Sequence, residues 1–264
     1  MGQALRPSGS GPKMARGGGK AADYSPGARI DPPLSPVQAE QTMASWTELD
    51  TPHGPVRAWR ADPGGPSHGA VIVLQEIFGA NAHIREVAGR FAAAGFVALA
   101  PALYDPVAPG IELPYDEAGT QRGVALRNEL GFDRAVDIVA VAAETLHAEG
   151  LRVGAVGFCW GGSVAFLANT RLGLPAVSYY GARTLPFLDE PLRAPMMFQF
   201  GQADHSIPED AIAQHRQKQP RAAIHVYEGA GHAFNRDVDN HVFDPAAADL
   251  AWQRTLDFLQ ENLR

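Results

Sequence analysis

A single cysteine stands between two glycines in residues 153–163, which read V-G-A-V-G-F-C-W-G-G-S. Small and β-branched residues at the start of this stretch predict a buried strand, and residues 162–169 predict a helix. A nucleophile on a sharp turn between a strand and a helix has a strained backbone, and flanking glycines remove the side chains that would collide there. Cys159 would then stand at a helix N-terminus, where unpaired N–H groups favour a thiolate. The other interpretation is a buried structural cysteine between packing glycines.

Two later loops supply an acid and a histidine that could act with Cys159. Asp204 follows the strand-like residues 195–200, and His232 follows the strand-like residues 223–227. Both are expected at the sheet edge that carries the cysteine, in the chain order of a hydrolase triad. His232 would accept the thiol proton or hold it as an ion pair, and Asp204 would orient the imidazole. Alternatively, the aspartate is a turn residue and the histidine pairs with a backbone carbonyl.

The rest of the chain alternates between strand-like and helix-like segments. Short apolar runs predict strands buried on both faces, and apolar residues three or four apart predict helices. The predicted elements are a hairpin over residues 45–62, strands over 69–75, 96–100, 176–180, 195–200 and 223–227, and helices over 84–94, 135–146 and 246–263. This alternation predicts a mostly parallel sheet between two helix layers, a three-layer α/β sandwich.

Residues 104–131 interrupt this alternation. The segment is rich in proline, glycine and acidic residues, and its hydrophobic periodicity is weak. It follows a predicted strand, at the end where open α/β sheets place ligand-binding loops. We therefore expect a long insert beside the substrate.

The composition excludes several classes of protein. The chain has 264 residues, 45% of them hydrophobic and 19% charged, which is typical of one large soluble α/β domain. A net charge of −7 argues against binding to nucleic acid. No apolar run approaches the ~20 residues of a membrane helix. The nine histidines form no H-x-H or H-E-x-x-H pattern, so no metal and no cofactor are expected.

Residues 1–42 differ in composition from the rest. They contain seven glycines and six prolines, but no Phe, Trp or Cys. Such a segment cannot bury enough apolar surface to offset its ordering entropy, which predicts a disordered tail before a domain over residues 43–264. The tail has no apolar core and no twin arginine of an export signal, and we expect a cytoplasmic protein.

Several stretches resemble the dienelactone hydrolase family of α/β-hydrolases. They are residues 75–81 (Q-E-I-F-G-A-N), 157–162 (G-F-C-W-G-G), 179–181 (Y-Y-G), the turn at Asp204, and 231–236 (G-H-A-F-N-R). The first is the most discriminating, because few hydrolases carry an acid directly after this strand. The resemblance covers the chain from about residue 70 to the C-terminus, and it implies the α/β-hydrolase fold in a single domain.

The resemblance also implies roles for residues near the nucleophile. In the resting enzyme, Glu76 would contact the Cys159 thiol and help to control its activation. The backbone N–H groups of Ile77 and Trp160 would stabilise the oxyanion, in agreement with the general pattern of this fold. A carboxylate beside the sulfur would oppose a thiolate and accept the S–H hydrogen bond. The other interpretation of Glu76 is a solvent-facing acid or a helix cap.

Family members hold the carboxylate of the substrate with two arginines. Arg236, four residues after His232, matches one of them, and Arg122 matches the other after a shift of one residue. The aromatic residues that family members place after the second arginine are replaced here by residues 123–126, G-V-A-L. This departure leaves the identity of the lactone open.

These observations lead to a cofactor-free, cysteine-dependent hydrolase as the expected function. Its substrate would be a small anionic enol-lactone or activated ester, cleaved through an acyl-thioester intermediate. One alternative is a broader carboxylesterase or thioesterase. Another is a non-catalytic small-molecule binder on the same fold. Either a monomer or a small homo-oligomer is compatible with the sequence.

Overall fold

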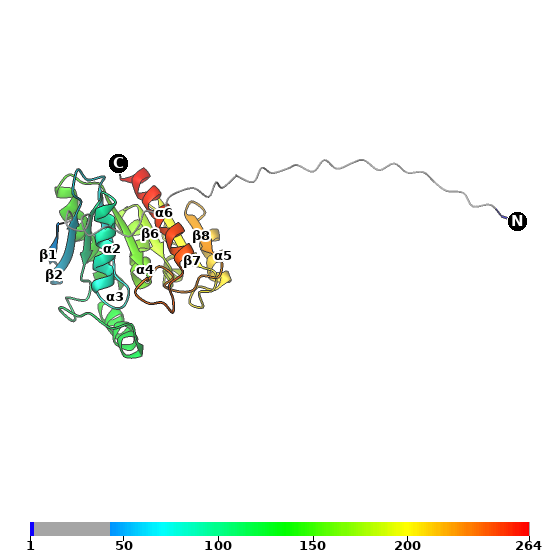
Figure 1. Cartoon of the computed structure of the whole chain (residues 1–264), viewed down its shortest axis with the longest axis horizontal. Coiled ribbons are helices and arrows are strands. Elements are labelled where there is room, and N and C mark those ends of the chain that lie inside the picture. The colour runs from blue at the N-terminus through cyan, green and yellow to red at the C-terminus, as the bar shows by residue number, and fades with distance from the viewer. Residues whose placement is uncertain (3–42, 264) are drawn as a thin grey trace. The chain divides into compact units, whose positions relative to one another are not determined.

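The computed structural model describes residues 1–2 and 43–263, and its described strands form one eight-stranded sheet (Figure 1). The predicted tail therefore lies outside the described residues, apart from Met1 and Gly2. The strands are β1 (Met43–Thr51), β2 (Gly54–Asp62), β3 (Ala70–Leu74), β4 (Val97–Pro101), β5 (Val153–Phe158), β6 (Ala176–Tyr179), β7 (Met196–Gly201) and β8 (Ala223–Tyr227).

The strand order is β1-β2-β4-β3-β5-β6-β7-β8. Strands β1 and β2 form the predicted antiparallel hairpin, in which Trp46 stands opposite Trp59, and β2 runs antiparallel to β4. All pairs from β4 to β8 are parallel. Every residue of β3 to β7 is buried, as their continuous apolar runs indicate. The predicted mostly parallel α/β fold is confirmed.

Helices cover both faces of this sheet. The described helices are α2 (Ala82–Ala93), α3 (Glu117–Ala148), α4 (Trp160–Leu167), which continues as a π-helical turn over Ala168–Leu172, a 3₁₀ turn over Leu185–Phe187, α5 (Glu209–Lys218) and α6 (Pro245–Asn262). Crossovers between parallel strands are right-handed. The chain moves across the sheet in one direction from β3 to β4 and in the other direction from β4 onward, so α3, α4 and α5 lie on the face opposite α2. Helix α6 packs against α2, where the rings of Phe91 and Trp252 lie 4.5 Å apart.

The expectation of an irregular segment over residues 104–131 is wrong in its second half. Helix α3 begins at Glu117, after Asp116 caps its N-terminus, and a break at Gly131 (φ 75°) separates two helical parts. The inward positions of the first part are Gly119, Gly123, Leu126 and Leu130. The spacing of these positions is that of a helix, but two of the four are glycines, so the hydrophobic signal in the sequence is weak. In Figure 1 this part of α3 extends beyond the lower edge of the sheet.

The first part of α3 lies directly on the loop that follows β3. A Cβ atom on Gly123 would stand only 2.2 Å from the carbonyl oxygen of Ile77. The hydroxyl of Tyr104 donates a hydrogen bond to the Gly123 carbonyl at 3.2 Å. The helix therefore covers the sheet edge at which β3 and β5 end, and it defines one wall around the predicted nucleophile.

Candidate active site

Cys159 occupies the tight turn between β5 and α4. Its backbone has φ 53° and ψ −117°, a strained conformation for a residue with a side chain. A Cβ atom on Gly157 would lie 1.9 Å from the carbonyl oxygen of Gly161. A Cβ atom on Gly161 would lie 2.4 Å from the carbonyl oxygen of Leu74. The two glycines thus allow the turn to close and to pack against the end of β3, as the sequence predicts.

Asp204, His232 and Cys159 form a continuous hydrogen-bonded chain. The Nε2 atom of His232 lies 3.1 Å from the Cys159 sulfur, and Nδ1 lies 2.7 Å from Oδ2 of Asp204. Asp204 is buried, and its second oxygen accepts a hydrogen bond from the Ser206 amide at 2.8 Å. The carboxylate is therefore fixed on both sides, and it holds the imidazole with one nitrogen facing the thiol.

The charges around His232 favour its protonated form. Burial opposes the charge, but hydrogen bonds and electrostatic interactions with Asp204 and Cys159 prevail and raise the pKa of His232 to about 10. His232 is therefore charged at neutral pH. An imidazolium next to sulfur supports nucleophilic attack by a thiolate.

The two predicted oxyanion donors belong to segments in direct contact. Ile77 follows β3, and Trp160 is the first residue of α4, where a helix leaves its N–H groups without intrahelical partners. The close approach of Gly161 to the carbonyls of Leu74 and Gln75 joins these segments. The Trp160 ring stacks on Tyr104 at 5.5 Å, which fixes the start of α4 against the neighbouring loop.

Glu76 pairs with Arg236, and no described hydrogen bond joins it to Cys159. Oε2 of Glu76 lies 3.5 Å from Nη1 of Arg236, and Oε1 is buried without a hydrogen-bond partner. Nη2 of Arg236 donates to Asp239 at 2.9 Å. The guanidinium is therefore balanced by two carboxylates, and Glu76 is neither exposed nor a helix cap. Among the described residues, the sulfur has His232 as its hydrogen-bond partner and Glu76 has Arg236.

Tyr115 is a site residue that the sequence analysis missed. The Arg236 guanidinium lies 4.3 Å from the Tyr115 ring and 5.6 Å from the Phe78 ring. The Tyr115 hydroxyl accepts a hydrogen bond from the side chain of Asn81 at 3.0 Å. Burial and the nearby charge of Glu76 raise the pKa of Tyr115. The proline-rich sequence around this tyrosine hid it, because it has no periodicity to assign a direction to the side chain.

Tyr180 also adjoins the triad without having been singled out from the sequence. Its ring lies 5.1 Å from the His232 ring in an edge-to-face arrangement, and its hydroxyl is buried without a partner. Its backbone has a positive φ of 40°. The only sequence signal for it is its place in the Y-Y-G stretch directly after β6.

Asp237 connects the loop of Arg236 to helix α2. One of its oxygens forms an ion pair with Arg90, and the other lies 3.4 Å from Nδ1 of His83. Despite burial, these partners lower the pKa of Asp237 to about 2. Asp237 is therefore charged at neutral pH and forms its ion pair with Arg90. Helix α2 thus anchors the segment that carries Arg236.

The structure does not bring Arg122 to the triad. Its side chain is exposed on α3 and makes no described hydrogen bond or ion pair. Arg127, five residues further along the same helix, is half-buried and interacts electrostatically with Cys159. Successive side chains of a helix differ in direction by about 100°. An alignment error of one residue therefore assigns the wrong face of the helix, and the match to the family could not show that Arg127 rather than Arg122 points inward.

The described residues contain no group of three or more His, Cys, Asp or Glu side chains placed to hold a metal ion. Among the helices of residues 43–263, none has the length and apolarity needed to cross a membrane.

Comparison with known proteins gives one consistent family. The model of the dienelactone hydrolase family matches residues 56–263. A carboxymethylenebutenolidase of Pseudomonas putida is 34% identical over 200 residues, covering 72% of this chain and 84% of the relative. Carboxymethylenebutenolidase 1 of Cupriavidus pinatubonensis is 32% identical over 212 residues, covering 76% of this chain and 90% of the relative. A candidate dienelactone hydrolase crystallised from Klebsiella pneumoniae has a TM-score of 0.72 at 28% identity, covering 82% of this chain and 98% of that one.

Replacement of Asp204 by asparagine tests the electrostatics of the triad. Asp204→Asn removes a charge that raises the pKa of His232, so this pKa falls from about 10 toward the ordinary 6.5. Titration of the histidine ring signals by NMR measures it, with the His232 signal assigned from its loss in His232→Gln. Asp189→Asn, at an exposed carboxylate bonded to Lys218, is the control and leaves the titration unchanged.

The same pKa has a consequence for stability. A folded-state pKa above the unfolded value stabilises the fold fully below about 6.5, and this contribution is lost as the pH rises through about 10. The difference in unfolding free energy between wild type and Asp204→Asn therefore shrinks over that pH interval. A difference that grows with pH would contradict the assignment of the proton to His232.

Proposed function

The chain belongs to the dienelactone hydrolase family, and from this membership and the Cys159–His232–Asp204 geometry we propose that it hydrolyses an enol-lactone or an activated ester through an acyl-thioester. The observation that carries the proposal is the distance of 3.1 Å between Nε2 of His232 and the nucleophilic sulfur. A group at this distance exchanges a proton with the sulfur directly. The curated relatives named above are carboxymethylenebutenolidases, which supports a lactone as substrate.

The proposed reaction has two halves. In the first, a lone pair of the Cys159 sulfur forms a bond to the ester carbonyl carbon, and the carbonyl electrons move to oxygen. The backbone N–H groups of Ile77 and Trp160 stabilise this oxyanion. When the tetrahedral intermediate collapses, the C–O bond breaks, and His232 gives its proton to the departing oxygen. The product of this half is a thioester on Cys159.

In the second half, water replaces the leaving group. His232, now neutral, accepts a proton from water as the water oxygen bonds to the thioester carbon. The C–S bond then breaks, the electron pair returns to sulfur, and the imidazole retains the proton. The carboxylic acid gives its proton to solvent water and leaves as carboxylate, and the starting ion pair is restored. Asp204 remains ionised throughout and stabilises the imidazolium.

A thiolate favours activated substrates over ordinary alkyl esters. It is itself a good leaving group, so the tetrahedral intermediate proceeds to the thioester only when the competing oxygen also leaves readily. An enolate or a phenolate meets this requirement, whereas a simple alkoxide does not. A broader carboxylesterase or thioesterase is the second candidate. Such an enzyme would hydrolyse charged and neutral esters with similar kcat/KM. A non-catalytic binder would react with an ester once without turnover.

Substitution of the nucleophile tests the proposal. Cys159→Ala lowers kcat/KM for 4-nitrophenyl valerate by about 10³-fold or more, because it removes the attacking atom while the fold is retained. Cys159→Ser is nearly as poor, since a serine hydroxyl keeps its proton in a site that holds an imidazolium. Melting temperatures check the fold, and mass spectrometry after an acid quench checks for the acyl group on wild-type Cys159. Near-native activity of the serine variant would refute thiolate chemistry.

Arg236 is proposed to bind a carboxylate of the substrate. Its planar guanidinium can grip that group through two parallel hydrogen bonds, which the ammonium group of lysine cannot reproduce. Arg236→Lys and Arg236→Ala therefore raise KM for 4-nitrophenyl hydrogen glutarate by about tenfold, and raise KM for neutral 4-nitrophenyl valerate much less. Equal effects on these five-carbon esters would favour the broader esterase.

Glu76 is proposed to restrain the nucleophile in the absence of substrate. Its buried carboxylate neutralises Arg236 and adds negative charge to the site in which the Cys159 sulfur must carry negative charge to attack. A substrate carboxylate that takes over Arg236 would release Glu76 from this pair. The Cys159 sulfur would then differ in reactivity before and after substrate binds.

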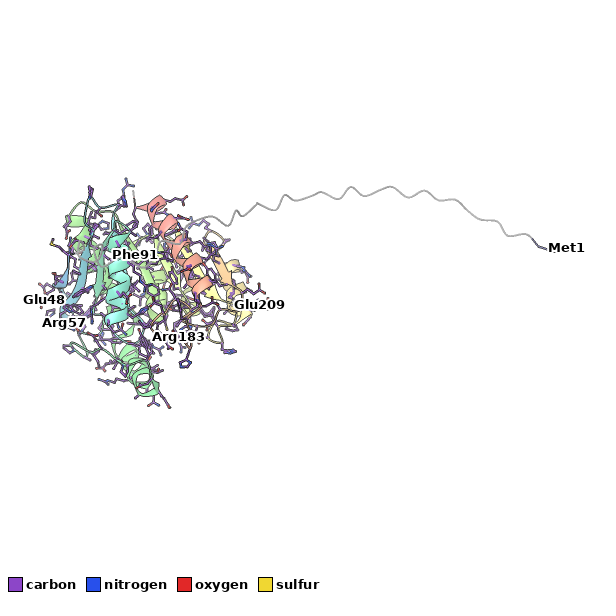
Figure 2. All side chains as sticks on the ribbon, in the orientation of Figure 1. Met1, Glu48, Arg57, Phe91, Arg183 and Glu209 are labelled. Atoms are coloured by element: carbon purple, nitrogen blue, oxygen red, sulfur yellow. The ribbon has the colours of Figure 1, made fainter. Side chains whose placement is uncertain are left out.

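Alkylation of Cys159 by iodoacetamide tests this restraint. Because Glu76→Gln removes the negative charge, it increases the alkylation rate at neutral pH and changes its pH profile. Glu209→Gln, at an exposed glutamate of α5, is the matched control and leaves both unchanged (Figure 2). Superimposable profiles of wild type and Glu76→Gln would refute the restraint and leave the triad intact.

A further inference from the structure

Two arginines near the nucleophile have no carboxylate partner. Within the described residues, the guanidinium of Arg183 makes no hydrogen bond or ion pair, and that of Arg127 bonds only to the amide oxygen of Asn128, at 3.0 and 3.2 Å. Arg236, in contrast, is balanced by Glu76 and Asp239. The positive charge that is free to bind an anion therefore resides on Arg127 and Arg183.

Arg183 is positioned by the helix that follows the nucleophile. It comes shortly after β6, and its backbone N–H donates a hydrogen bond of 3.0 Å to the Ser163 hydroxyl in α4. Its side chain is exposed, and Figure 2 labels it near the lower edge of the sheet in this view. Ser163 is four positions after Cys159, about one helical turn, so the backbone of Arg183 is held about one turn from the nucleophile.

Arg127 belongs to helix α3, on the other side of the start of α4 from Arg183. It lies on the first part of α3, which packs on the Ile77 loop through Gly123. Phe132, just after the break in α3, contacts both sides of the gap between the elements: its ring lies 6.2 Å from Trp160 and 5.3 Å from Phe187. The segment after β6 and helix α3 therefore face each other beside the start of α4.

The electrostatics of these groups agree with this placement. Burial and the positive charge of Arg183 lower the pKa of Arg127, and Cys159 acts electrostatically on the same guanidinium. Two like charges without counter-ions repel each other, which is unfavourable. An anion between them removes the repulsion and gains charge-assisted hydrogen bonds.

We propose that Arg127 and Arg183 form a subsite, separate from Arg236, that binds a carboxylate group of the substrate next to Cys159. This inference rests on the proposed function, because it concerns the substrate of the same nucleophile. A carboxylate fits the pair, since each planar guanidinium can offer two N–H donors to its oxygens. A substrate with two acidic groups would use both this subsite and Arg236. The chemical class is therefore an activated ester or lactone of a di- or polycarboxylic acid.

Three matched esters test the subsite. The neutral reference is 4-nitrophenyl valerate, 4-nitrophenyl hydrogen glutarate carries a carboxylate on the acyl side, and 3-carboxy-4-nitrophenyl valerate carries one on the leaving group. Each is assayed at low and high salt with wild type, Arg127→Gln, Arg183→Gln and the double variant. Arg216→Gln, which removes the same charge from an exposed position on α5, is the control. Melting temperatures establish that each variant is folded.

Wild type is expected to hydrolyse at least one carboxylate ester about tenfold better than the neutral ester at low salt, as kcat/KM. Arg127→Gln and Arg183→Gln each remove most of that preference, because they lower kcat/KM for the carboxylate ester far more than for the neutral ester. The double variant loses little more than either single variant, because both groups grip one anion. Arg216→Gln retains the preference.

Several results would overturn the subsite. These are the absence of preference for either carboxylate ester, an equal loss on neutral and charged esters, or a preference that survives both substitutions. Stronger competitive inhibition by inorganic phosphate than by glutarate would also overturn the assignment of a carboxylate. If Arg236→Lys alone changes charge selectivity, the proposed function stands and this inference fails.

Binding measurements separate the subsite from the chemistry. Calorimetric titration of wild type with glutarate is expected to show binding that weakens about tenfold in Arg127→Gln and in Arg183→Gln. If wild type hydrolyses none of the esters but this binding and its dependence on the two arginines remain, the subsite stands and the proposed hydrolysis fails. If glutarate binding is unchanged in both variants, the subsite fails whatever the activity.

Discussion

The site depends on one steric constraint, the close approach of the turn at Cys159 to the end of β3. Gly157 and Gly161 allow backbone atoms to meet where any side chain would collide. This contact places the start of α4 against the loop of Ile77, and so sets both predicted oxyanion donors around one nucleophile. Strain at Cys159, with its positive φ, is the cost of that proximity, and the fully buried strands on either side support it.

Charge is distributed unevenly around this turn. The triad side carries an imidazolium between a carboxylate and a sulfur, with the pKa of His232 raised to about 10. The Arg236 side is balanced by Glu76 and Asp239 before any substrate arrives. On the α3 side, Arg127 and Arg183 have no carboxylate partner among the described residues. A protein with a net charge of −7 thus keeps positive charge near Cys159, which would draw the proposed anionic substrate to the site rather than to the surface in general.

The sequence was most informative where one residue type had one physical explanation. The G-x-C-x-G turn, the buried parallel strands and the positions of Asp204 and His232 after strands were predictable, because strand order and loop position bring such residues to one edge. The first part of α3 was not, since glycines occupy half of its inward positions. Tyr115 and the pairing of Glu76 with Arg236 depend on how a loop folds back over β3. Hydrophobic periodicity does not predict the path of such a loop. It also gave no way to choose Arg127 over Arg122 as the inward arginine of α3.

Helix α2 has a consequence for how this site can vary. Its first turn is capped by Asn81, directly after the loop of Ile77, and its last turn contains Arg90, which holds Asp237 beside Arg236. Helix α2 therefore connects the loop of the proposed oxyanion donor Ile77 to the loop of Arg236, the proposed binder of the substrate carboxylate. If both proposals hold, a mutation that tilts α2 would change rate and selectivity together. Evolution or engineering toward a new substrate would then be easier on α3 and on the segment after β6, which α2 does not anchor.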